Sequence, residues 1–264
     1  MIKKIFCSFL IVFLLSPSSI FANSVFIDPG HGGSDSGAIS YDNKFEEKDL
    51  NLDTAKACIE ELEEYGIIVY TSRTDDTYIS LEERSRMANE IKDLDLFVSI
   101  HHNASTNSSV NRGEVIYSVR EKESQKLAEC ISKKLYDIGS AEVKIYNRYN
   151  SRGTDYYSVL RNTDATSIIV EISFITSAEG VSLVDTPEKR QKNGILIAQG
   201  IMDYLGVDYS EEANKENNKT VEEKANKENN NNLGLNILKN ILNKKRNKLN
   251  EKTGKEKLLE ILKK

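Results

Sequence analysis

The stretch LDLFVSI, residues 94–100, is a nearly continuous apolar run that is followed at once by His101 and His102. A run of this kind is typical of a strand that is buried on both faces. The chain has only 3 histidines in 264 residues, and two of them stand where this strand is expected to end. The stretch therefore predicts a buried strand with a functional end.

Strand and helix patterns alternate on both sides of this run. Further strands are expected at 25–28, 67–73, 114–119, 156–160 and 167–172, and helices at 49–65, 81–92, 121–138 and 186–205. Such alternation indicates an α/β fold with a single twisted, mostly parallel sheet flanked by helices. In open sheets of this class, functional side chains gather beyond the carboxyl ends of the strands.

Composition divides the chain into four parts. Residues 1–22 have the layout of a cleaved secretory signal, which predicts a protein that is secreted or lies at the cell wall outside the cytoplasmic membrane. Their apolar run is shorter than the ~20 residues that span a bilayer. Residues 23–208 form the globular body, and 209–232 form a low-complexity, flexible linker. Residues 233–264 form a basic tail in which leucines at helical spacing predict short amphipathic helices.

The charge follows the same divisions. Residues 211–264 hold 14 Lys/Arg and 9 Asp/Glu, so that the body, residues 23–210, carries a net charge of −12 within a total of −5. An acidic body argues against nucleic acid as its ligand. The basic tail predicts attraction to anionic wall polymers or to a membrane surface, although a tail that only aids solubility accounts for the same charge.

Ionisable residues at the strand ends indicate a metal site. His31, in IDPGHGG (27–33), follows the first strand, His101 follows the buried strand, and Glu171 ends the last apolar strand. Two histidines and one carboxylate, with an open position for water, form a common zinc site. Candidate carboxylates stand at the start of the first helix, where capping by an acid is an equally simple explanation: Glu46, Glu47 and Asp49.

In their order and spacing, five blocks of the body resemble the zinc-dependent N-acetylmuramoyl-L-alanine amidases of amidase family 3, which act in bacterial cell-wall hydrolysis. The blocks are IDPGHGGSDSGA, EKDLNL, TSRTDDTYISLEERSRMAN, DLFVSIHHNA and RGTDYYSVLRNTDATSIIVEISFITS, and the resemblance spans about residues 25–205. Five matching blocks are specific, whereas GHGG alone would be weak.

The resemblance implies a Zn²⁺ ion held by His31, Glu47 and His101, with Glu171 as the catalytic residue. The EKDLNL register favours Glu47 over Glu46. The implied reaction is hydrolysis of the amide between the lactyl group of N-acetylmuramic acid and L-alanine of the peptidoglycan stem peptide. The alternatives are a zinc peptidase that cuts within stem peptides and a wall-binding module without chemistry.

Residues near these four receive weaker assignments. His102 departs from the small or apolar residue that is common in relatives, and in a strand it points away from His101, so it cannot easily share the same metal. Ser99 and Asn103 could orient ligands or substrate. Asn103 and Arg161 are the candidate substrate-binding residues, because Asn103 belongs to a family block and arginine suits the carboxylates of a peptide stem.

Other features leave alternatives open. Arg73 and Arg84 match family positions, but ion pairs near the sheet explain them as well as substrate contact does. Cys58 and Cys130 form a disulfide or remain thiols. No G-x-S-x-G elbow supports a serine hydrolase, and GHGGSDSG lacks the lysine of a phosphate loop. The segment between His101 and Glu171 predicts an open cleft, without an inserted helix that blocks the site. A separate protein activator is compatible with this prediction.

Overall fold

The computed structural model describes residues 23–210, so the expected leader, the basic tail and nearly all of the linker lie outside the described residues. In this part of the chain six strands form one sheet in the order β2-β1-β3-β6-β4-β5. The strands are β1 (Ser24–Pro29), β2 (Ile68–Thr71), β3 (Leu96–Asn103), β4 (Gly113–Tyr117), β5 (Val143–Tyr146) and β6 (Thr166–Phe174). The predicted α/β class is confirmed.

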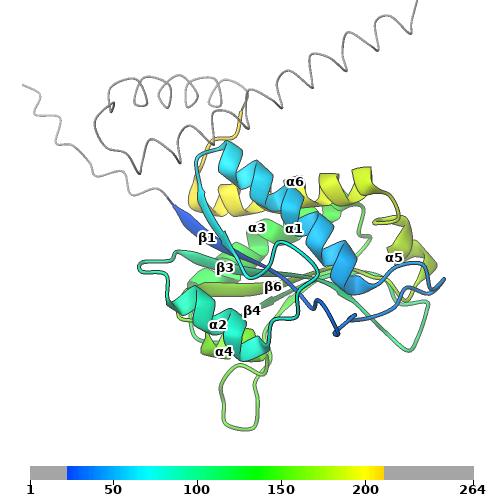
Figure 1. The fold of residues 1–264 in the computed structure, drawn as a ribbon, viewed down its shortest axis with the longest axis horizontal. Coiled ribbons are helices and arrows are strands. Elements are labelled where there is room, and N and C mark those ends of the chain that lie inside the picture. The colour runs from blue at the N-terminus through cyan, green and yellow to red at the C-terminus, as the bar shows by residue number, and fades with distance from the viewer. Residues whose placement is uncertain (1–22, 211–264) are drawn as a thin grey trace, which may run out of the picture.

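Helices cover both faces of the sheet (Figure 1). One face packs against α1 (Glu47–Glu64), α3 (Lys122–Ile138) and α6 (Pro187–Leu205), and the other packs against α2 (Leu81–Asn89) and α4 (Ser158–Asn162). The short helix α5 (Ala178–Ser182) follows β6. Along β3, Val98 and Ile100 enter the first layer and Phe97 enters the second. The run LDLFVSI is apolar because both of its faces are covered.

The sheet is parallel over four strands and then reverses. Strands β2, β1, β3 and β6 run in one direction, β4 is antiparallel to β6, and β5 is parallel to β4. The reversal brings the beginning of β4, rather than its end, to the C-terminal half of β6. Glu114 of β4 is consequently the register partner of Glu171.

Local predictions were wrong in two places. Residues 156–160, expected as a strand, instead lead into α4, because a helical turn buries Val159 and Leu160 against the sheet and this burial outweighs the β-propensity of the tyrosines. Strand β5 was not expected at all. In addition, β3 extends to Asn103 and β6 to Phe174, so that His101 and Glu171 lie within their strands near the C-terminal ends.

Two further findings concern the described part of the chain. Cys58, buried in α1, and Cys130, half-buried in α3, are both free thiols. Burial raises the pKa of the Cys58 thiol, which therefore stays protonated at neutral pH. Between residues 23 and 210, every helix is too short or too polar to span a bilayer.

Candidate active site

Three segments bring His31, Glu47 and His101 together. His31 lies in the turn after β1, Glu47 is the first residue of α1, and His101 lies near the end of β3. Oε1 of Glu47 is 3.1 Å from Nε2 of His31 and 2.9 Å from Nδ1 of His101. One donor atom from each residue lies within 4.8 Å of the others. Two imidazoles and one carboxylate are the protein donor set of many catalytic zinc sites.

Glycines allow these side chains to approach one another. His31 itself has a backbone φ of 60°, in the left-handed region, and Gly32 and Gly33 follow with φ values of 130° and 56°. A Cβ atom on Gly30 would stand 2.1 Å from Cε1 of His101, and one on Gly37 would stand 2.6 Å from Oε2 of Glu47. The space that a side chain would fill is occupied by the candidate ligands.

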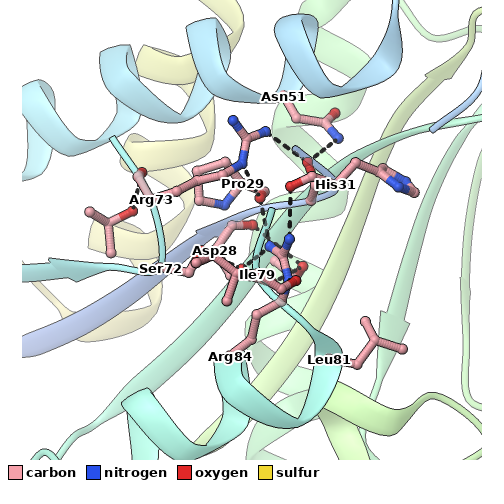
Figure 2. A network of polar contacts seen from close by, with 12 residues as sticks. Asp28, Pro29, His31, Asn51, Ser72, Arg73, Ile79, Leu81 and Arg84 are labelled. Atoms are coloured by element: carbon pink, nitrogen blue, oxygen red, sulfur yellow. Dashed lines mark hydrogen bonds and ion pairs between the residues drawn. The ribbon is translucent and has the colours of Figure 1, made fainter. Parts of the chain in front are cut away.

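Arg84, from α2, holds the turn that carries His31 (Figure 2). Its guanidinium donates to Oδ1 of Asp28 at 2.6 Å and to the carbonyl oxygens of Pro29 and His31, each at 2.7 Å. Arg84 and Asp28 are both buried. Burial alone would raise the pKa of Asp28, but the charge of Arg84 and hydrogen bonds to the carboxylate outweigh burial and lower it.

Arg73 joins the same turn to the start of α1 (Figure 2). It donates to the carbonyl oxygens of Pro29 at 3.0 Å, of Gly30 at 2.8 Å and of Lys48 at 2.8 Å. Sequence reasoning left substrate contact and structural support equally open for Arg73 and Arg84. The contacts of both guanidinium groups with the backbone show structural support.

Glu47 is buried, and both of its carboxylate oxygens have partners. Oε2 accepts a hydrogen bond from the Ala38 amide at 2.9 Å. Besides the two histidines, Oε1 contacts the His102 amide and Nδ2 of Asn51, both at 3.2 Å. Burial raises a carboxyl pKa, but the donors outweigh burial here, and the pKa of Glu47 lies well below its ordinary value.

Asp35 is an orienting residue that sequence reasoning missed. Its Oδ2 lies 2.8 Å from Nδ1 of His31, so that Nε2 of the same ring is the nitrogen that faces Glu47. Carboxylates that bind the far nitrogen of a ligand histidine fix its orientation and tautomer. Its position four residues after His31, in GHGGSD, is the signal that could have revealed it.

Glu171 faces the same site without a partner. It is the register partner of His101 on the neighbouring strand. Its Oε2 is sealed from solvent and accepts no hydrogen bond from any residue of the described chain. Burial, together with the negative charges of Glu47 and Glu114, raises the pKa of Glu171 well above its ordinary value. A carboxyl group with a raised pKa beside candidate metal ligands suits proton transfer.

Glu114 is a second acid that sequence reasoning missed. It is buried, and its Oε1 accepts a hydrogen bond from Nε of Arg112 at 2.6 Å. Its Oε2 accepts bonds from Nδ2 of Asn103 and from the hydroxyl of Tyr146, both at 3.0 Å. A charged residue within the apolar strand EVIY was the available signal, but only the reversal of β4 places it beside Glu171.

The remaining predicted site residues divide between the two ends of the sheet. Asn103 lies at the site, where its side chain binds Glu114 and the amide of Ala104. Arg161 lies in α4 and donates to the carbonyl oxygens of Asp155 and Tyr156. Asp155 in turn binds Ser118 and Val119, which follow β4 at the end of the sheet away from Glu171. The structure does not group Arg161 with the other predicted residues.

His102 points to the opposite face of β3 from His101. Its ring is buried, and Nδ1 lies 2.7 Å from Oδ1 of Asn51 in α1. Burial lowers the pKa of His102 to about 4, so that the ring is neutral at physiological pH. His102 does not belong to the convergent group formed by His31, Glu47 and His101.

Comparison with known proteins gives consistent matches. A family model described as N-acetylmuramoyl-L-alanine amidase matches residues 25–203. N-acetylmuramoyl-L-alanine amidase LytC of Bacillus subtilis is 35% identical over 187 residues, which make up 70% of this chain and 36% of LytC. The probable cell wall amidase LytH of Staphylococcus aureus is 33% identical over 191 residues, 71% of this chain and 58% of LytH.

A solved structure gives the same match in three dimensions. The catalytic domain of CwlV, an N-acetylmuramoyl-L-alanine amidase from Bacillus (Paenibacillus) polymyxa var. colistinus, superposes with a TM-score of 0.63 at 28% identity. The match covers 70% of this chain and 99% of that domain. By contrast, this chain spans only 36% and 58% of the two curated relatives, LytC and LytH.

Proposed function

The chain belongs to the N-acetylmuramoyl-L-alanine amidase family, and from this premise we propose that it hydrolyses the amide between the lactyl group of N-acetylmuramic acid and L-alanine of the peptidoglycan stem peptide. One observation carries the proposal. The donor atoms of His31, Glu47 and His101 converge beside Glu171, a carboxylate that has a buried oxygen without a hydrogen-bond partner. Action on peptidoglycan places the protein outside the cytoplasmic membrane or at the wall.

We assign Zn²⁺ to His31, Glu47 and His101. The chemistry of the three donors supports this assignment, and so does the space left by Gly30 and Gly37, which the ligand side chains fill. When bound, Zn²⁺ lowers the pKa of water from about 16 towards 7 and polarises a carbonyl group. Asp35 and Asn51 hold the ligands through the contacts described above.

Glu171 supplies the proton transfer in this proposal. Its carboxylate takes one proton from the attacking water as the new C–O bond forms at the amide carbonyl. It then delivers that proton to the departing nitrogen as the C–N bond breaks, which leaves a free amino group on L-alanine. A raised pKa suits both steps, whereas Glu47, with a lowered pKa, remains an anion and a ligand.

Mass analysis of digested peptidoglycan tests the proposed bond. The protein should release intact stem peptides with a free N-terminal L-alanine, lose this activity with a zinc chelator, and regain it when Zn²⁺ is restored. Shortened stem peptides would identify a peptidase instead. Absence of any cleavage by the zinc-loaded protein would indicate a wall-binding module and would contradict an enzymatic function.

The proposal extends to the parts of the chain outside the described residues. Residues 1–22 are assigned to export, 23–208 to catalysis, 209–232 to a linker, and the basic residues 233–264 to attachment at anionic wall polymers or a membrane surface. Truncation after residue 210 should weaken binding to purified walls at low salt. At low salt the attraction between exposed basic residues and an anionic surface is little screened, so the loss of these residues has its largest effect there. Equal binding of the truncated and full chains would contradict a binding role for the tail.

A further inference from the structure

Asn51 lies where the three ligand-bearing segments meet. From α1, its Nδ2 donates to Oε1 of Glu47 and to the carbonyl oxygen of Gly30, both at 3.2 Å. Its Oδ1 faces Nδ1 of His102, in β3, at 2.7 Å. Asn51 is fully buried, and its amide points at the turn before His31 (Figure 2). One amide group therefore connects α1, this turn and β3.

Only one orientation of this amide satisfies its partners. The Glu47 carboxylate and the Gly30 carbonyl are acceptors, so both need the NH₂ end of Asn51. The reversed amide would set three oxygen atoms against one another at hydrogen-bond distance. The oxygen of Asn51 must therefore face His102, and the short contact with it requires a proton on Nδ1 of that ring.

The other nitrogen of His102 leads to the same tautomer. Within the described chain, Nε2 is buried and has no hydrogen-bond partner. In the tautomer with its proton on Nε2, that buried N–H would have no acceptor, and the lone pair of Nδ1 would face the oxygen of Asn51. In the tautomer with its proton on Nδ1, only the lone pair of Nε2 is unused, which costs less free energy. The surroundings of both ring nitrogens therefore place a proton on Nδ1.

We propose that His102 is a positioning residue for the metal centre: its Nδ1–H fixes the Asn51 amide, which in turn holds the Glu47 carboxylate in place. This inference rests on the proposed metal site. The ring of His102 lies on the opposite face of β3 from His101, and the backbone amide of His102 donates a hydrogen bond to Glu47. Its side chain influences Glu47 through Asn51.

Two substitutions separate the donor from the bulk of the ring. His102→Asn retains an N–H group near the position of Nδ1, and His102→Leu retains volume but removes the donor. In competition with a chromophoric zinc chelator, His102→Leu should bind Zn²⁺ about 10- to 100-fold more weakly than the natural protein, the usual effect of losing an outer-shell partner. His102→Asn should recover most of that loss. Ile100→Val, a substitution on the same face of β3, controls for loosened packing and should leave Zn²⁺ affinity unchanged.

Natural Zn²⁺ affinity in folded His102→Leu would overturn the proposal, as would equal losses in the Leu and Asn variants. The natural protein provides a test that needs no variant, in case the Leu variant does not fold. With only 3 histidines in the chain, ¹⁵N NMR of the imidazoles can assign the tautomer of each. His102 should carry its proton on Nδ1, and a proton on Nε2 would overturn the proposal.

These measurements are independent of amide hydrolysis. If the protein binds Zn²⁺, shows the Nδ1–H tautomer and loses affinity in His102→Leu, but releases no free N-terminal alanine, the proposed function fails and the positioning role stands. If peptidoglycan is cleaved as proposed while His102→Leu binds Zn²⁺ normally, the positioning role fails and the function stands.

Discussion

Glu47 and Glu171 are the same residue type at one site, yet the fold places them in opposite surroundings. Four groups contact Oε1 of Glu47, and a backbone amide donates to its Oε2. Oε2 of Glu171 has no partner among the described residues. The pKa of Glu47 is lowered and that of Glu171 is raised, although burial favours the neutral form of both.

The difference teaches that the number of hydrogen-bond donors around each carboxylate, more than burial, distinguishes the two proposed roles. A carboxylate surrounded by donors stays charged and fixed, as a metal ligand must. A carboxylate without donors, placed beside two other acids, holds a proton more readily than an ordinary glutamate does. Substitutions at Glu171 and at Glu47 test this comparison separately. We expect them to differ in the property that changes as well as in the size of the change.

The largest effect is expected from Glu171→Gln. The substitution keeps the shape of the side chain but removes proton transfer, so release of N-terminal alanine from purified peptidoglycan should fall by about 10⁴-fold. Zinc content, measured on the same preparation, should stay at the natural level. Turnover within tenfold of the natural protein would exclude Glu171 from the reaction.

The next largest effect is expected from Arg84→Met, which removes support from the turn of His31. It leaves Asp28 as an unpaired buried charge, and the free energy of unfolding should fall by about 3 kcal/mol in urea denaturation. Arg86→Met, in an exposed ion pair on the same helix, is the matched control and should cost less than about 0.5 kcal/mol. Similar losses for the two variants would show that the Asp28–Arg84 pair has no special weight.

Glu47→Gln tests the carboxylate that is surrounded by hydrogen-bond donors. Loss of its negative charge should weaken Zn²⁺ binding by about 100-fold or more, because a direct ligand should count for at least as much as an outer-shell partner. Glu46→Gln is the control, since Glu46 precedes α1 and its side chain is half exposed. If Glu46→Gln were the variant that loses Zn²⁺, the assignment of the carboxylate ligand would be wrong.

The smallest effect concerns stability and pH. Because the pKa of Glu171 is higher in the folded state than in the unfolded chain, the folded state binds the extra proton, and this contribution to stability is lost as pH rises from about 4.5 through the folded-state pKa. At pH 7, metal-free Glu171→Gln should therefore be more stable than the natural protein, by about 1 kcal/mol or 2–4 °C in melting temperature. Thermal melts at pH 5 and pH 7 measure the difference, with exposed Glu179→Gln as the control. A stabilisation that is the same at both pH values would contradict this origin.

The apolar patterns predicted much of the site because they locate strand ends. The positions of His31, His101 and Glu171 follow from the short strand at 25–28 and the buried strands LDLFVSI and SIIVEI. The apolar patterns do not identify Glu47 as a site residue. An acid in the first turn of a helix interacts favourably with the helix dipole whichever way its side chain points, so its presence there needs no further explanation. The choice between Glu46 and Glu47 came from the family resemblance, and the structure shows Glu47 turned inward and buried.

Local patterns could not predict what depends on tertiary pairing. The residues of β4 do not indicate whether it runs parallel or antiparallel to β6, so the sequence could not assign Glu114 to the site. The tyrosines at 156–157 favour a strand locally, and only packing against the sheet makes the following residues helical. Asn51 had a readable signal, a polar residue four positions after Glu47, but its three partners come from three separate segments.

The reversal of β4 also decides which loops are open to change. Residues 104–112 and 139–142 lie at the end of the sheet that holds Glu114 and Glu171, so insertions there would change the surroundings of the candidate active site. Residues 118–121 and 147–157 lie at the opposite end. A fluorescent label or a fused domain placed in 147–157 should leave hydrolysis intact, while altered substrate choice should be sought by varying 104–112.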